Sequence, residues 1–400
     1  MYAFQFHPIK KSTSVIANFK KLCEALNISE VEMKKALSLP PEERYVASSV
    51  KKADGSTRAI FKPHNLIRKI QRRINRRIFK TLVIWPSYLY GSIPNTIDPT
   101  TKKVIEHKDY VNCAAQHCSS KSLLKMDIKD FFDNIHRDYV SDIFTVFFKF
   151  PPDVSEALTS ICCRENTLVQ GALTSSYLAN LVLWDIEGDL VKKLNRKNLT
   201  YTRLVDDITV SSKVSNFQFD LAISLISSAL ISKELPINTS KTQVSYVSSN
   251  PLTVHGMRVN FPEPRYPSDE VRKLRASVHN LQCLASQPGY RQSHSYRKDY
   301  ACCMGRVNKL KRVKHEKHAV LIKKLNKIKP LPSEVDQRRC KQMLRRLQND
   351  YKNKHLDYWY CKRFYRLHDR LNVLQRKSCF RDLAEKIREE MRLIKPTYDQ

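Results

Sequence analysis

Three aspartates in this sequence stand within or at the end of apolar segments. Asp127 closes the apolar run of residues 123–126, and Asp206 and Asp207 interrupt the run of residues 204–210. Successive strand side chains face opposite sides, and unpaired charges are costly in an apolar setting. The adjacent pair therefore predicts a tight hairpin or a bound cation. Carboxylates from two such strands can hold two Mg²⁺ ions, one activating an attacking 3′-hydroxyl and the other neutralising a leaving pyrophosphate.

A turn lies between the two acid-bearing segments. Gln170-Gly171 is followed by Thr174, Ser175 and Ser176, which are suited to begin a helix. A glycine at this point lets the backbone approach a base pair closely, and the helix after it would pack on the sheet.

The elements around these motifs alternate short strands and helices to about residue 260. A hairpin is predicted from Tyr45 to Pro63, with its turn at Asp54-Gly55. A basic amphipathic helix is predicted for residues 66–78, with one face made of isoleucines. These isoleucines are Ile67, Ile70, Ile74 and Ile78.

Charge is concentrated in the last third of the chain. The sequence has 71 Lys and Arg against 39 Asp and Glu, a net charge of +32, of which +20 lies in residues 268–400. Apolar spacing predicts helices from Ser268, as N-cap, to Pro288 and around residues 296–310, with further basic helices from Pro330 to about Ile394. Such a field favours contact with a polyanion, although solvated helix faces are the alternative. Trp359 and Phe364 are predicted to face the core.

Several classes of protein are excluded by composition. No apolar run approaches the roughly 18 residues of a membrane span, and the N-terminus lacks the pattern of a secretory signal. Eleven cysteines without a Cys-x-x-Cys pair indicate reduced intracellular thiols, so we expect a cytoplasmic protein. The glycine-rich loops of dinucleotide-binding and P-loop proteins are missing.

The order of the motifs resembles the palm of reverse transcriptases. It runs from Asp-x-x-x-Phe-Phe at 127–132 through Gln-Gly-x-x-Thr-Ser at 170–175 and the Asp-Asp pair to Asn-Thr-Ser-Lys-Thr at 238–242. Residues 201–209 are especially similar to bacterial retron enzymes and their relatives in phage defence. The resemblance implies an α+β right-hand polymerase with fingers, an antiparallel palm sheet, a helical thumb and a basic helical C-terminal extension. The expected boundaries are 1–120 for N-terminal helices and fingers, 121–262 for the palm, 263–329 for the thumb and 330–400 for the extension.

The resemblance also implies roles for single residues. Asp127, Asp206 and Asp207 match the catalytic, metal-binding acids, with the backbone of Ile128 helping to hold two Mg²⁺ ions, for which Mn²⁺ is an expected substitute. Phe132 matches the gate against ribonucleotides. The other expected dNTP contacts are Arg58, Gln170, Gly171 and Lys241. The expected nucleic-acid contacts are Arg68, Arg72, Arg73, Arg76, Arg338, Arg345, Arg346, Arg363 and Arg366.

Some positions depart from the family pattern. Leu204 stands where most members have Tyr, and Val169 where many have Pro. The Asn-Ala-x-x-His stretch of retrons keeps only its Ala and His at residues 113–117, and their Val-Thr-Gly is Val-His-Gly at residues 254–256.

The implied activity is RNA-directed DNA synthesis in bacterial antiviral defence. Its expected partners are dNTPs, a structured non-coding RNA template and the cDNA product, without a membrane; a homo-oligomer or an effector protein stays open. Leu204 keeps template-independent or protein-primed synthesis as an alternative. A catalytically dead RNA-binding scaffold is a further alternative, which the intact aspartates disfavour.

Overall fold

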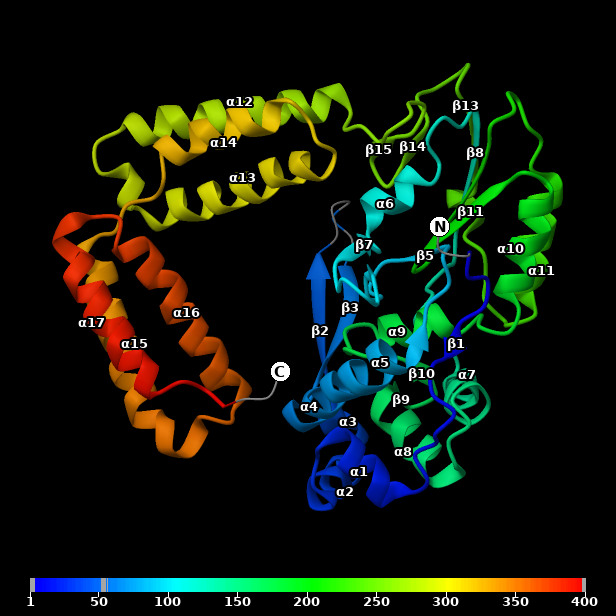
Figure 1. Ribbon diagram of the computed structural model, residues 1–400, viewed down its shortest axis with the longest axis horizontal. Helices are drawn as coiled ribbons and strands as arrows, with labels where there is room; N and C mark the ends of the chain where they lie inside the picture. The colour runs from blue at the N-terminus through cyan, green and yellow to red at the C-terminus, as the bar shows by residue number, and fades with distance from the viewer. Residues whose placement is uncertain (1–3, 52–54, 56, 398–400) are drawn as a thin grey trace. The chain divides into compact units, whose positions relative to one another are not determined.

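The computed structural model describes residues 4–51, 55 and 57–397. The chain forms two compact units, Met1–Arg265 and Tyr266–Gln400 (Figure 1). One apolar core fills the N-terminal unit, and two separate apolar clusters lie in the C-terminal unit. Among the described residues, no helix has the length and apolarity needed to cross a membrane.

A five-stranded sheet, ordered β13-β8-β12-β11-β5, forms the centre of the N-terminal unit. Neighbouring strands are antiparallel except β11 and β5, which are parallel. Strand β8 lies between β12 and β13, and its side chains are almost all buried. The strands are β5 Leu89–Tyr90, β8 Ser122–Asp127, β11 Thr200–Leu204, β12 Asp207–Ser212 and β13 Gln243–Tyr246.

Helices and short strand pairs surround this sheet, and α10 and α11 lie side by side next to it (Figure 1). The helices are α1 Phe19–Leu26, α2 Glu30–Leu37, α3 Pro41–Arg44, α4 Asn65–Ile74, α5 Lys80–Leu82, α6 Tyr110–Ala115, α7 Arg137–Asp142, α8 Pro152–Cys162, α9 Ser175–Leu181, α10 Glu187–Arg196 and α11 Asp220–Ile231. The strand pairs are β1 Ile9–Lys10 with β4 Val83–Ile84, β6 Thr96–Ile97 with β7 Val104–Glu106, β9 Cys163–Arg164 with β10 Thr167–Leu168, and β14 Thr253–Val254 with β15 Met257–Arg258.

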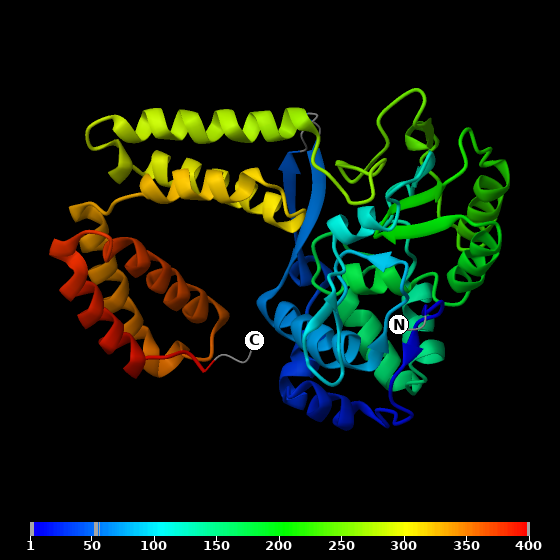
Figure 2. The same cartoon turned by 45° about the horizontal axis from the view of Figure 1, so that its top comes forward.

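The predicted hairpin is present as β2 Tyr45–Lys51 paired with β3 Thr57–Pro63 (Figure 2). Asp54 of the predicted turn lies outside the described residues, whereas Gly55 has the positive φ of +84° that favours glycine. One hydrogen bond between the hairpin and the rest of the unit is made at Phe61, whose backbone amide donates to the carbonyl of Gln170 over 2.8 Å. A backbone hydrogen bond therefore joins the predicted hairpin to the predicted Gln-Gly turn.

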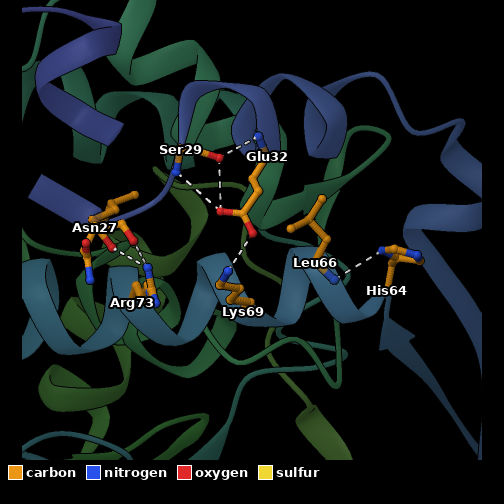
Figure 3. A network of polar contacts seen from close by, with 8 residues as sticks. Asn27, Ser29, Glu32, His64, Leu66, Lys69 and Arg73 are labelled. Atoms are coloured by element: carbon orange, nitrogen blue, oxygen red, sulfur yellow. Dashed lines mark hydrogen bonds and ion pairs between the residues drawn. The ribbon is translucent and has the colours of Figure 1, made fainter. Parts of the chain in front are cut away.

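The predicted basic helix is α4, which continues through a π-helical turn at Asn75–Phe79. Its isoleucine face is buried, as expected. Lys69 forms an ion pair with Glu32, and Arg73 donates to the carbonyls of Leu26 and Asn27 at the end of α1 (Figure 3). A cation at a helix C-terminus is favourable, because carbonyls there lack helical partners. The guanidinium of Arg73 thus has a structural role, and its contact with nucleic acid stays a prediction.

The C-terminal unit consists of two helical bundles, each around its own apolar cluster. In the first, α12, α13 and α14 run side by side, with Val278 and Val307 fully buried (Figures 1 and 2). The bundles are α12 Ser268–Ser286, α13 His294–Arg312 and α14 Lys317–Lys327, then α15 Glu334–Lys354, α16 Tyr358–Leu374 and α17 Arg381–Leu393.

Two predictions for this unit are wrong. The N-cap of α12 is Pro267, which has extended φ and ψ, so Ser268 is already helical. Trp359 is 55% exposed, although Phe364 is buried as predicted. The buried face of α16 follows the helical period through Tyr360, Phe364 and Leu367, and Trp359 lies one residue, about 100° around the helix, away from it.

An ion pair joins the two bundles of the C-terminal unit. Arg297 of α13 donates from both terminal nitrogens to Asp336 of α15, each over 2.8 Å. Asp336 also accepts from the amide and hydroxyl of Ser333 in a capping box at the start of α15. Burial raises the pKa of Asp336, but the bonds from Arg297 and Ser333 outweigh it and lower this pKa to about 2.

Candidate active site

The ends of two neighbouring strands bring the three aspartates together. Asp127 is the last residue of β8 and Asp207 is the first of β12, and the two are partners in the antiparallel register. Asp206 lies in the tight connection between β11 and β12, where its carbonyl accepts from the amide of Ile128 over 3.1 Å. The acidic pair therefore lies at a hairpin, one of the two settings that its sequence predicts.

The turn that carries Asp206 is strained. Val205 has φ +62°, in the left-handed region that β-branched residues rarely adopt. Gly91 lies against this turn, and a Cβ there would be 3.2 Å from the Val205 side chain. A larger residue at position 91 would push this side chain by a few tenths of an ångström, and its φ of +76° is one that other L residues adopt only with strain.

A buried ion pair between Arg203 and Glu187 contacts the backbone of this turn. Arg203 is fully buried and donates to both carboxylate oxygens of Glu187, over 2.5 and 2.7 Å. Its Nη1 also donates to the carbonyl of Val205 over 3.0 Å. A buried guanidinium is tolerated when its donors are satisfied. Arg203 is therefore a positioning residue for the turn.

The local field at the three acids is strongly negative. Burial is the main cause that raises the pKa of Asp206. Burial and then the neighbouring Asp206 and Asp127 raise the pKa of Asp207 to about 6. Lys241 offsets part of this charge, with its Nζ 2.9 Å from Oδ2 of Asp127. The side-chain Nδ2 of Asn238 donates to the same oxygen over 3.1 Å.

The donor chemistry of these acids fits a divalent cation. Carboxylate oxygens are the ligands that Mg²⁺ prefers, and a cation would relieve the repulsion that raises the pKa of Asp207. The ammonium of Lys241 already lies at Asp127, which shows that this carboxylate attracts positive charge. Among the described residues, no set of three or more His, Cys, Asp or Glu side chains is preassembled as a metal site. Two-metal binding therefore stays a prediction.

The predicted dNTP contacts lie in the same unit. A cavity of about 290 Å³ is lined by Asp127, Asp207 and Lys241 together with His255. Burial raises the pKa of Asp206, and the positive charge of Arg58 on β3 offsets a small part of that rise.

The aromatic and turn positions complete this set. Phe132 is partly buried beside Phe131, with 6.0 Å between ring centroids. At Gly171, which has φ +113°, a Cβ would lie 2.5 Å from the Phe61 carbonyl oxygen, so glycine is required. Their roles toward a nucleotide stay predictions.

Sequence reasoning missed the contacts of two histidines, one beside Asp207 and one buried against β11 and β12. His255 has its Nδ1 3.8 Å from Oδ2 of Asp207, and burial, followed by the charge of Lys125, lowers its pKa to about 4. His117 is fully buried between Thr202 and Ser211, 2.7 Å from each hydroxyl. Burial lowers its pKa to about 3, so it is neutral. Both lie in the stretches that depart from the retron pattern, which is the signal that could have identified them.

Comparisons with known proteins agree with this geometry. Residues 50–272 match the family described as "Reverse transcriptase (RNA-dependent DNA polymerase)". The chain is 44% identical over 400 residues to the Retron Ec48 reverse transcriptase of Escherichia coli, covering 99% of this chain and 97% of that protein. It is 30% identical over 298 residues to the Retron Se72 reverse transcriptase of Salmonella heidelberg, covering 74% and 75%.

Among solved structures, one match is a telomerase from Candida albicans in complex with a TWJ fragment of telomeric RNA. It aligns with a TM-score of 0.39 and 12% identity over 90% of this chain and 68% of that chain. A similarity this low supports no argument about function.

Proposed function

The chain belongs to the reverse transcriptase family, among the enzymes of retrons, and on that premise we propose that its three aspartates form a two-Mg²⁺ site for copying a structured non-coding RNA into cDNA. It is an RNA-directed DNA polymerase with a right-hand polymerase fold. The observation that carries the proposal is the register of Asp127 with Asp207 beside the Asp206 turn, with the raised pKa of Asp207.

The proposed reaction is nucleotidyl transfer. The 3′-hydroxyl oxygen of the growing strand loses its proton to water and bonds to the α-phosphorus of a dNTP. The bond from that phosphorus to the oxygen bridging to the β-phosphate breaks, and pyrophosphate leaves. Asp127, Asp206 and Asp207 would hold the ions, which when bound activate the hydroxyl and neutralise the leaving group. Divalent ions are usual in this family.

The protein's other side chains would bind and orient the nucleotide. Arg58 and Lys241 supply positive charge for the triphosphate, and the Gln170-Gly171 turn offers backbone close to the base pair. Phe132 would close against the 2′ position of the sugar. Because Lys241 now contacts Asp127, we propose that it leaves this carboxylate when the nucleotide and its ions bind.

The partner and setting belong to the same proposal. The net charge of +32 suits a polyanionic RNA template, and the two similar enzymes are named as retron reverse transcriptases. A cytoplasmic location fits the described cysteines, which are all free thiols. A role in antiviral defence rests on the resemblance to defence-associated relatives alone.

Replacing single acids tests the two-metal assignment. Asp206→Asn and Asp207→Asn should each abolish dNTP incorporation on an RNA template with Mg²⁺, because the ions need anionic oxygens. Asp220→Asn, at an exposed position that begins α11, is the matched control and should keep activity. Near-normal incorporation by either active-site variant would contradict the assignment.

Template-independent synthesis remains a second candidate because of Leu204. Leu204 stands beside the strained turn, at a position where most of the family has the larger tyrosine. A Cβ added at Gly91 would lie 3.3 Å from the Leu204 side chain. Treating the purified protein with RNase before adding dNTPs separates the two. Synthesis that survives complete removal of RNA would favour the second candidate, and synthesis that stops would favour templated copying.

A further inference from the structure

An aromatic pair projects from the start of α16, away from the core of its bundle. The rings of Tyr358 and Trp359 meet edge to face, with 5.2 Å between their centroids. Trp359 is 55% exposed, whereas the next residue, Tyr360, is buried and donates its hydroxyl to the carbonyl of Ile394. The bundle core is therefore complete without the indole of Trp359.

Cations border this aromatic pair. The Nζ of Lys362 lies 4.9 Å from the ring centre of Trp359 and 5.8 Å from that of Tyr358. Arg366, four residues further on, is also exposed. Positions 359, 362 and 366 share one helix face. The Trp359 patch is defined here as Tyr358, Trp359, Lys362 and Arg366.

Charge within this bundle is uneven. Residues 334–374, which span α15 and α16, hold eleven Lys and Arg against five Asp and Glu, whereas α17 holds four of each. Two of the five acids are already paired, Asp336 with Arg297 and Asp350 with Arg363 and Lys354. The helix that carries the patch therefore belongs to the basic part of the bundle, and its field suits a polyanion rather than an acidic or neutral surface.

We propose that the Trp359 patch binds unpaired nucleotides of a single strand, with a base stacked on the indole and the phosphates near Lys362 and Arg366. This rests on the proposed function, since the strand would be the RNA template or the cDNA product. Aromatic faces stack on any base, while basic side chains neutralise the backbone, so such a site distinguishes unpaired from paired nucleic acid. A duplex hides the base faces that the indole would contact.

Fluorescence can follow this site directly. The sequence has three tryptophans, and the other two, Trp85 and Trp184, are only partly exposed. Oligo(U) or oligo(dT) of about 12 nucleotides, added to the full-length protein freed of RNA, should quench the emission of Trp359. The quenched component should disappear in Trp359→Phe and remain in Trp184→Phe.

Affinity variants then separate stacking from other kinds of docking. Trp359→Ala should weaken oligonucleotide binding roughly 5- to 150-fold, the usual effect of losing one stacked base. Lys362→Met should reduce the slope of log affinity against log salt by about 0.7. The matched control is Leu356→Ala, which removes an equally exposed apolar side chain from the preceding turn and should change neither value.

Comparing the affinities of oligo(U) and oligo(dT) shows which kind of strand the patch prefers. Tighter binding of oligo(U) assigns the patch to RNA, tighter binding of oligo(dT) assigns it to cDNA, and equal binding assigns it to either unpaired strand. Unchanged affinity in Trp359→Ala would overturn the proposal. So would an equal loss in Leu356→Ala accompanied by loss of self-association, which would mark an apolar protein interface instead.

DNA synthesis by the same preparations keeps this proposal separate from the proposed function. Wild-type protein that quenches with oligonucleotide but makes no cDNA would contradict the polymerase assignment and leave the patch intact. Normal synthesis together with unchanged binding by Trp359→Ala would contradict the patch alone.

Discussion

The two units of the chain hold their charges in opposite ways. In the N-terminal unit, Arg203 and Glu187 are both buried, and two hydrogen bonds join the guanidinium to the two carboxylate oxygens next to the turn that carries Asp206. In the C-terminal unit, most charges lie on exposed helix faces, as in the pair of Lys273 with Glu270, and apolar residues fill the two bundle cores. Geometry in the first unit depends on single side chains, whereas the second presents a field to which many side chains contribute. Single substitutions should therefore have large effects in the first unit and small ones in the second.

Breaking the buried pair should have the largest effect. Arg203→Met leaves Glu187 buried without a counter-ion and Val205 without its donor, so we expect a loss of about 3–5 kcal/mol in the free energy of unfolding. Denaturant unfolding measures it. The double variant Arg203→Met with Glu187→Met should recover part of that stability but not the activity, because the turn would still lack the bond that positions it. Full activity in the double variant would show that the turn keeps its position without the hydrogen bond from Arg203.

Glycine substitutions give the next largest contrast. Gly171→Ala combines an unfavourable φ with a contact of 2.5 Å to a backbone oxygen, so we expect it to destabilise the N-terminal unit and to reduce dNTP incorporation. Gly289→Ala in the C-terminal unit has a positive φ but nothing within 4 Å, so its cost should stay at roughly 1–2 kcal/mol. Thermal unfolding measures both effects. An equal loss of stability in the two variants would mean that the backbone at Phe61 shifts to make room for the added Cβ.

Asp336 is the exception to the small effects expected in the C-terminal unit. Its contribution to the free energy of unfolding should depend on pH. Because its pKa is about 2 in the folded chain and 3.8 ordinarily, its contribution is complete above pH 4 and is lost as the pH falls toward 2. The total is about 2 kcal/mol. Asp336→Asn should remove this part of the acid dependence of unfolding, whereas Glu334→Gln, at an exposed position two residues earlier, should keep it. An unchanged acid profile in Asp336→Asn would contradict the role given to the ion pair.

Substitution of one exposed cation should have the smallest effect on stability. Arg345→Gln on α15 should change the free energy of unfolding by less than about 0.5 kcal/mol. If Arg345 contacts a phosphate of the RNA, the salt slope of binding should become shallower by about 0.7–0.9. A marked loss of stability would show that the exposed face has a structural role.

Patterns of local spacing account for what could be predicted. The hairpin of β2 and β3 follows from its Asp-Gly turn signal, and the buried isoleucines of α4 follow from the helical period. Both signals lie within a short stretch of sequence. The aspartates could be located because an acidic pair inside an apolar run has few tolerated settings.

Contacts between distant residues account for what could not. The partner of Arg203 is 16 residues away, on a helix, and the pairing of Lys241 with Asp127 joins residues 114 apart. The exposure of Trp359 depended on which of two adjacent rings, Trp359 or Tyr360, continued the period of Phe364. Composition alone could not decide between them, because both rings are large and apolar.

The pairing of Arg297 with Asp336 makes the last bundle a poor candidate for a detachable module. A chain cut at Pro330 would lose the counter-ion of Arg297, the amide of Leu331 that donates to the Arg291 carbonyl, and the donor that Arg376 supplies to Pro330. The α12–α14 bundle would then carry an unmatched guanidinium on a partly buried helix face. A truncated enzyme should therefore also carry a substitution such as Arg297→Gln, which removes the unpaired charge. Only then can the effect of losing α15–α17 be assigned to the functions of those helices.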